Sequence, residues 1–122
     1  MALQHERGRA AEDAAARHVE GLGMRVVERN LRVGRLEIDI VAQDGEVIAL
    51  VEVRTRGRGA WQSAAGSIGH VKQGRLRSAA KLLWARRFSK WRGIERVRFD
   101  VAAVNLDAPD GPRVDYLRAA FI

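Results

Sequence analysis

Residues 36–54, LEIDIVAQDGEVIALVEVR, contain two apolar runs separated by the pair Asp44-Gly45. An Asp-Gly pair between such runs is a strong signal for a tight β-hairpin, because both central residues of a type I′ turn need positive φ. The stretch therefore predicts strands at 36–42 and 47–54, joined by a two-residue loop. In that register Gln43 lies opposite Glu46, and Glu37 lies opposite Glu52.

Charged side chains recur at every second position near the outer ends of these two strands. Because side chains alternate between the faces of a strand, Glu37, Asp39, Glu52 and Arg54 are expected on one side of the hairpin. Like charges that oppose each other across strands repel, and a divalent cation would neutralise them. Mg²⁺ or Mn²⁺ needs only one or two protein carboxylates, so Asp39 and Glu52 are the predicted metal ligands.

The alternative is that these acids simply face water at the strand ends, paired with Arg54 or Arg35. A loop of odd length would turn one strand over and separate the carboxylates. Spacing alone leaves both interpretations open.

The rest of the chain predicts helices packed on a mixed sheet. Helical periodicity covers 5–21, and a strand is expected at 24–31. A Gly-rich loop at 57–66 precedes a long helix from Ser67, as its N-cap, to about Phe88, and strand character resumes at 97–105. Residues 114–122 fit either a short strand or a short helix. The order α-β-β-β-α-β, without repeats or linkers, predicts one α/β domain over residues 1–122.

Positive charge is concentrated in the middle of the chain. Residues 54–94 contain eleven Lys and Arg and no Asp or Glu, whereas the remainder has eleven basic residues against 15 acidic ones. A solvated basic face is one explanation. A long acid-free segment is also what contact with a nucleic-acid backbone requires, so DNA is the expected partner.

Composition narrows the cellular setting. There is no cysteine, which excludes disulfides and thiolate zinc sites. The first thirteen residues carry charged side chains where a signal peptide needs an apolar stretch, and no segment approaches a membrane span. We therefore expect a cytoplasmic protein.

The spacing of Glu37-Ile38-Asp39 and Glu52-Val53-Arg54 resembles that of the PD-(D/E)XK nuclease superfamily. More closely, the chain resembles the YraN-like family of small bacterial proteins, which are similar to archaeal Holliday-junction resolvases. The resemblance covers nearly the whole chain. It is carried by Gly8-Arg9-Ala10-Ala11-Glu12, Asn30-Leu31-Arg32, Leu36-Glu37-Ile38-Asp39, Val51-Glu52-Val53-Arg54-Thr55-Arg56, the helical Lys72 and Arg98-Phe99-Asp100-Val101.

This resemblance implies a restriction-endonuclease-like core with Asp39 and Glu52 as the metal ligands. It places Arg54 at the catalytic lysine position of the superfamily, and it implies that Glu12 reaches the site from the first helix. Residue spacing agrees, because Glu12 falls at the edge of the buried face of that helix. The alternative for Glu12 is a surface acid near a helix N-terminus, favoured there by the helix dipole.

Three positions depart from the family pattern. Ala11 and Leu36 replace glycines, which adds side chains beside two of the acids. Arg54 replaces lysine, and an arginine cannot act as a base because its pKa exceeds ~12. Any reaction must therefore draw its nucleophile from water activated by the metal ion, with Arg54 orienting it or stabilising transition-state charge.

Further candidates for nucleic-acid contact lie in the 57–66 loop and on the second helix. Lys72 continues the buried stripe of that helix, where it either reaches the site or extends its ammonium group to water from a buried stem. Trp61 could stack on an unpaired base or anchor its own loop. The expected backbone contacts are Arg56, Arg58, Lys72, Arg75, Arg77 and Lys81.

Three functions follow from these features. The leading one is a magnesium- or manganese-dependent endonuclease that hydrolyses DNA phosphodiester bonds, with branched or nicked DNA as its suspected substrate. The second is a non-catalytic nucleic-acid-binding module that retains the nuclease fold, and the third is a scaffold whose basic face binds an acidic protein. A homodimer is a further expectation, because four-way junctions have two-fold symmetry.

Overall fold

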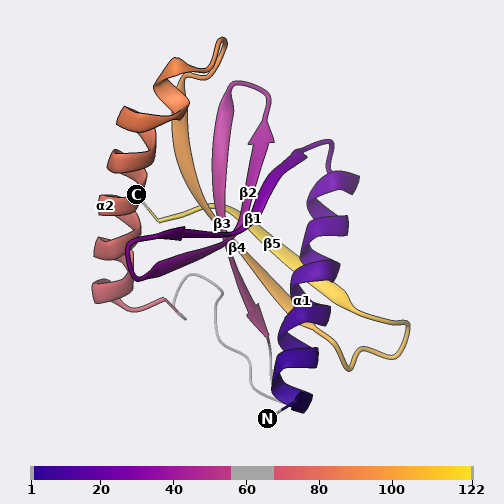
Figure 1. Ribbon diagram of the computed structural model, residues 1–122. Coiled ribbons are helices and arrows are strands. Elements are labelled where there is room, and N and C mark those ends of the chain that lie inside the picture. Colours follow the sequence, from indigo (N-terminus) through magenta and orange to yellow (C-terminus); the bar gives the residue numbers. More distant parts are fainter. Residues whose placement is uncertain (1, 56–67, 122) are drawn as a thin grey trace.

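The computed structural model describes residues 2–55 and 68–121 and contains one five-stranded sheet with helices against it (Figure 1). The predicted order α-β-β-β-α-β is confirmed, and the segment that the sequence left unassigned forms a fifth strand. The elements are α1 (Ala2–Gly21), β1 (Arg25–Val33), β2 (Leu36–Asp44), β3 (Val47–Thr55), α2 (His70–Arg86), the short 3₁₀ helix η2 (Phe88–Lys90), β4 (Arg96–Asn105) and β5 (Arg113–Phe121).

The strands lie in the order β1-β2-β3-β4-β5. Only β3 and β4 run parallel, and α2 lies in the connection between them. A parallel connection needs a long crossover, whereas short turns join β1 to β2 and β2 to β3. The middle of β3 is apolar without a break because both faces of the sheet are covered there.

Two core layers cover the sheet. On one face, small side chains of α1 such as Ala11, Ala15 and Val19 pack against β2, β3 and β4. On the other face, Leu76 and Ala79 of α2 pack with Phe88, which is completely buried. Small residues on α1 permit a close approach of helix to sheet, while the larger side chains fill the α2 side.

The β2–β3 hairpin forms, but its predicted register is wrong by two residues. Asp44 pairs with Val47, so the turn residues are Gly45 and Glu46 and not Asp44 and Gly45. Gly45 has φ 61° and Glu46 has negative φ, which is the φ pattern of a type II′ turn, not of type I′. Because the shift is even, the paired residues of the two strands keep their predicted faces. The regular pairing ends at Ile40 and Val51, before the acidic positions Asp39 and Glu52 are reached.

The start of α2 also differs from the prediction. The helix begins at His70, with Gly69 in the N-cap position at φ −68° and ψ 162°, and no side chain caps it. The Gly69 carbonyl accepts the first helical hydrogen bond from the Gln73 amide at 3.0 Å. Glycine adopts this extended geometry at little cost, so the predicted cap at Ser67 is wrong.

Within the described ranges, neither long helix is apolar enough to cross a membrane.

Candidate metal centre and basic surface

Asp39 lies where β2 and β3 separate. The paired register of the two strands ends at Ile40 and Val51, and beyond it the Val53 amide donates to Asp39 Oδ2 at 2.8 Å. Ile38 packs in the core layer of α2, whereas Ile40, two residues later, packs in the layer of α1. The regular alternation of β2 is therefore interrupted at Asp39, which lies between the two layers.

Three carboxylates from two different elements converge at this point. Oxygen atoms of Glu12 on α1 and of Glu37 and Asp39 on β2 lie within 4.8 Å of one another, and we call these three residues the acid cluster. Asn30 on β1 holds two of them, because its side-chain amide nitrogen donates to Glu12 Oε1 at 2.9 Å and to Glu37 Oε1 at 3.0 Å. Asn30 has φ 55°, a left-handed conformation that asparagine tolerates better than most residues.

The surroundings of the acid cluster disfavour ionisation. Burial, followed by the charge of Glu52, raises the pKa of Asp39 to about 7, although the Val53 amide and Lys72 act in the opposite direction. Burial also raises the pKa of Glu12, against the attraction of Arg29. A bound cation would favour the charged forms of both carboxyl groups.

Glu52 is buried next to the acid cluster and is held by two cations. The Lys72 ammonium group, from the first turn of α2, contacts Glu52 Oε1 directly. Arg54 Nε lies 3.7 Å from the same oxygen. This Nε is buried and has no hydrogen-bond partner among the described residues. Buried donors normally have a partner, so this N–H is available to a ligand.

The structure thus brings together the four residues that the sequence assigned to chemistry. Asp39 lies between Glu12 on one side and Glu52 on the other, and both carboxylates raise its pKa. Glu52 is paired with Lys72, and its sharing of a cation with Asp39 stays a prediction. The carboxylates grouped most closely with Asp39 are those of Glu12 and Glu37.

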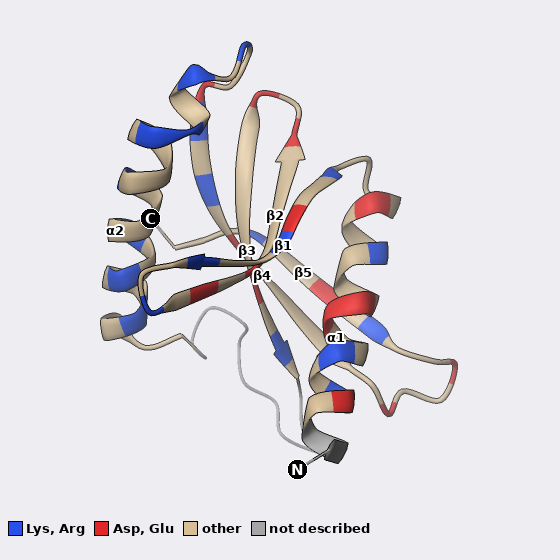
Figure 2. Ribbon diagram, in the orientation of Figure 1, with Lys and Arg blue, Asp and Glu red and all other residues tan. Residues whose placement is uncertain are grey.

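The remaining basic candidates lie on α2 or outside the described residues. Arg75, Arg77 and Lys81 are exposed on α2, which carries only basic charges along its length (Figure 2). Arg56, Arg58 and Trp61 fall in 56–67, outside the described residues. The structure therefore supplies a basic helix whose first turn also reaches the carboxylates through Lys72.

Residue spacing gave no role to Asn30, and it placed Glu37 on the same side of the hairpin as Glu52. That expectation is wrong, because Glu37 lies with Glu12 of α1 whereas Glu52 pairs with Lys72 of α2. Asn30 belongs to a quoted family motif without an assigned function. Its left-handed backbone and its position between two carboxylates depend on how α1 packs beside β1, which local sequence does not reveal.

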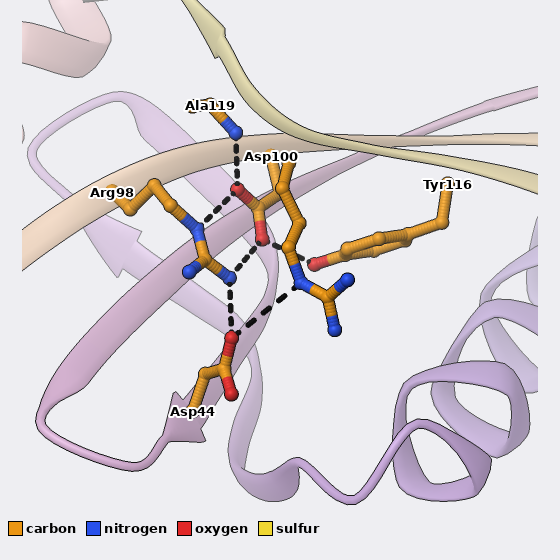
Figure 3. Close-up of polar contacts among 6 residues, drawn as sticks. Asp44, Arg98, Asp100, Tyr116 and Ala119 are labelled. Atoms are coloured by element: carbon orange, nitrogen blue, oxygen red, sulfur yellow. Dashed lines mark hydrogen bonds and ion pairs between the residues drawn. The ribbon is translucent and has the colours of Figure 1, made fainter.

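The late-strand motif Arg98-Phe99-Asp100-Val101 has a structural role (Figure 3). Asp100 is 1% exposed, and its carboxylate accepts two hydrogen bonds from Arg98 at 2.8 Å, one from Tyr116 Oη at 2.6 Å and one from the Ala119 amide at 2.9 Å. Arg98 also donates to Asp44 at 2.9 Å, at the turn end of β2. This network joins β5 to the end of the β2–β3 hairpin that lies farthest from Asp39.

Comparison with known proteins identifies the family. The model of "Uncharacterised protein family UPF0102" matches residues 11–104, which include Glu12, Asp39, Glu52 and Lys72. A UPF0102 protein of Sorangium cellulosum is 49% identical over 93% of this chain and 79% of its own length. A UPF0102 protein of Ectopseudomonas mendocina is 36% identical over 99% of this chain and 98% of its own length. A UPF0102 protein of Bordetella parapertussis is 46% identical over 93% of this chain and 63% of its own length. The chain therefore belongs to the UPF0102 family, the YraN-like family that its motifs resemble.

Proposed function

We propose that this protein is a metal-dependent endonuclease that hydrolyses phosphodiester bonds in DNA. The observation that carries the proposal is the position of Asp39, between the carboxylates of Glu12 and Glu37 on one side and Glu52 with Lys72 and Arg54 on the other. Such a site combines hard oxygen ligands with cations for a phosphate, beside a helix that has no acidic residue. The PD-(D/E)XK resemblance of the motifs supports the same function.

The donor set fits a magnesium or manganese ion. Both metals prefer carboxylate oxygens, and magnesium needs few protein ligands because it retains water and phosphate oxygens. Burial, followed by the charge of Glu52, raises the pKa of Asp39, and a bound cation would favour its charged form. Asp39 would be the central ligand, with Glu12 and Glu37 on one side of it and Glu52 on the other. A bound ion would supply Lewis-acid stabilisation of the phosphate and lower the pKa of water.

The chain supplies the positive charge of the site. An arginine side chain does not act as a base, so Arg54 would instead offer to a phosphate oxygen the Nε–H that has no hydrogen-bond partner among the described residues. Lys72 neutralises buried Glu52 in the absence of substrate and lies in the first turn of the basic helix. A phosphate that enters between these residues would meet donors on both sides.

The test is cleavage of supercoiled plasmid, single-stranded DNA and a four-way junction with magnesium or manganese. We expect nicking by the natural chain and loss of at least about 100-fold for Asp39→Ala and Glu52→Ala, which remove groups from the reacting site. Asp110→Ala removes an exposed acid outside the site and should cleave normally. Equal activity in all four proteins would assign the cleavage to a contaminant.

A second candidate is a nucleic-acid-binding module without catalysis. Arg54 at the position of the catalytic lysine favours it, because arginine removes one route to an activated water. This candidate predicts DNA binding that falls linearly in log salt, with no cleavage of any of the three substrates. Asp39→Ala would then leave binding unchanged or improve it, since it removes a negative charge.

A further inference from the structure

A groove of about 850 Å³ lies between the tip of the β1–β2 hairpin and α2. Its walls come from residues 33–36 of the hairpin, which reaches toward α2 in Figure 1, and from one face of α2. The α2 face consists of Val71, Gly74, Arg75, Ser78, Ala79 and Leu82. The groove is built on the two elements that also carry Glu37 and Lys72.

The groove exposes apolar side chains. Val71 is 71% exposed and Leu82 is 38% exposed, and Val33 and Leu36 line the opposite wall. Gly74 lies between them on α2, and a Cβ there would meet nothing within 4 Å. A glycine inside a helix is less favourable than alanine, and its effect here is to leave space in the groove. A cluster of exposed apolar side chains of this kind is typical of a binding surface.

Among the residues that the structure describes, the charged side chains that line the groove are all positive. Arg35 and Arg75 both belong to its lining, and neither forms an ion pair with any residue in the described ranges. Each of the groove residues is neutral or basic. The occupant that this surface fits is therefore anionic and carries apolar faces.

We propose that the groove holds unpaired nucleotides of a DNA strand, with their bases on the apolar floor and their phosphates against Arg35 and Arg75. This inference rests on the proposed function, because it makes the groove a substrate subsite of the same nuclease. Leu36 immediately precedes Glu37, and Val71 immediately precedes Lys72, so a strand in the groove lies against both elements that bear the site. The preferred substrate is DNA with an unpaired segment, not an intact duplex.

Unpaired DNA fits this surface better than the other anionic partners. A duplex stacks its bases inside and presents mainly phosphates at its surface, and phosphates do not make favourable contacts with the apolar side chains of the groove. Unpaired bases expose faces that pack on side chains next to their own phosphates. A second copy in a two-fold interface would bring two pairs of arginines together without an acidic residue in either groove.

The main test fills the groove without removing charge. Gly74→Leu places a side chain in open space on a helix, so it should not lower the thermal midpoint. Ala85→Leu adds bulk to an exposed position of the same helix outside the groove and is the matched control. Binding is measured by fluorescence anisotropy, with EDTA present so that no cleavage occurs, on labelled oligothymidine of about twelve nucleotides and on a duplex of equal length.

We expect the natural chain to bind the single strand more tightly than the duplex. Gly74→Leu should weaken strand binding by about fivefold or more and duplex binding by less than about twofold, and Ala85→Leu should change neither. Arg75→Gln should weaken strand binding more than Lys81→Gln, although each removes one charge from α2. Equal losses for strand and duplex, or no effect of Gly74→Leu, would overturn the proposal.

Two further outcomes are distinct. If a Glu-rich peptide competes with the strand on the natural chain and loses its binding in Gly74→Leu, the occupant is an acidic protein segment and the proposal fails. If groove variants behave as expected but no DNA is cleaved with metal, the endonuclease proposal fails while the groove assignment stands. If Asp39→Ala abolishes cleavage but Gly74→Leu leaves cleavage of every substrate unaffected, the endonuclease proposal stands and the groove assignment fails.

Discussion

The Val53 amide donates a 2.8 Å hydrogen bond to the side chain of Asp39 at the point where β2 and β3 stop pairing. A backbone donor that would otherwise lose its partner is satisfied by a carboxylate, so the two strands can separate without an orphaned amide at that position. The same bond holds Asp39 in place between Glu12 and Glu52. A feature of the backbone thereby positions the central carboxylate of the site.

Asp39→Asn should make the stability of the protein less dependent on pH. The pKa of Asp39 rises from 3.8 to about 7 on folding, so the folded state binds its proton more tightly than the unfolded state. The contribution of the Asp39 carboxyl group to the free energy of unfolding is therefore fully present below about pH 4 and is lost as the pH rises through 7. Asparagine can still accept from the Val53 amide but carries no charge.

Urea unfolding at pH 5 and pH 8 measures this effect. The variant should be more stable than the natural chain at pH 8, by at most roughly 4 kcal/mol, and the difference should shrink at pH 5. Asp110→Asn makes the same change at an exposed position and should follow the natural chain. A constant difference at both pH values would contradict the ionisation of Asp39 as its cause.

Magnesium or manganese should stabilise the natural chain at pH 8. An ion that binds only the folded state adds about 2.7 kcal/mol at 100 times its dissociation constant. Differential scanning calorimetry should show a higher midpoint with the metal for the natural chain and for Asp110→Asn, and a much smaller shift for Asp39→Asn. A metal-induced shift of equal size in all three proteins would place the ion elsewhere.

Lys72→Met should destabilise the protein because it leaves Glu52 buried without its closest cation. Loss of one partner from a fully buried pair costs about 3–5 kcal/mol, and roughly 2 kcal/mol is expected here because Lys72 is partly exposed. The double variant Lys72→Met, Glu52→Gln removes both charges and should recover part of the loss. A double-mutant cycle in urea gives the coupling, and strictly additive losses would show that the contact contributes nothing.

Tyr116→Phe should lower stability and leave cleavage intact. The substitution removes the 2.6 Å hydrogen bond from Tyr116 to buried Asp100, for an expected cost of about 1–3 kcal/mol. Burial and the negative charge of Asp100 raise the pKa of Tyr116, so the phenol remains a donor across the working pH range and the cost should not vary with pH. Metal-dependent cleavage by the folded variant should match that of the natural chain, and a large loss of it would place the Asp100 network in the site.

Most of the architecture was predictable because it depends on local patterns. Apolar runs and turn residues located four strands and both long helices to within a few residues. The errors arose where local rules allow more than one answer: Gly45 serves type I′ and II′ turns alike, and Gly69 took the cap position expected of Ser67. The last strand, β5, was ambiguous because its side chains are mostly half-exposed and give a weak periodic pattern. Its extended conformation also depends on pairing with β4, which local sequence does not show.

The sequence by itself determined the acid-free basic segment and the two acid-bearing strands of the hairpin. These properties are set by residue order and by local turn signals, so they survived the error in register. Only the tertiary structure decided that Glu12 and Asn30 meet Asp39, and that Lys72 pairs with Glu52. Those contacts join residues far apart in the chain, and they depend on how the helices pack where two strands separate, which no local pattern encodes.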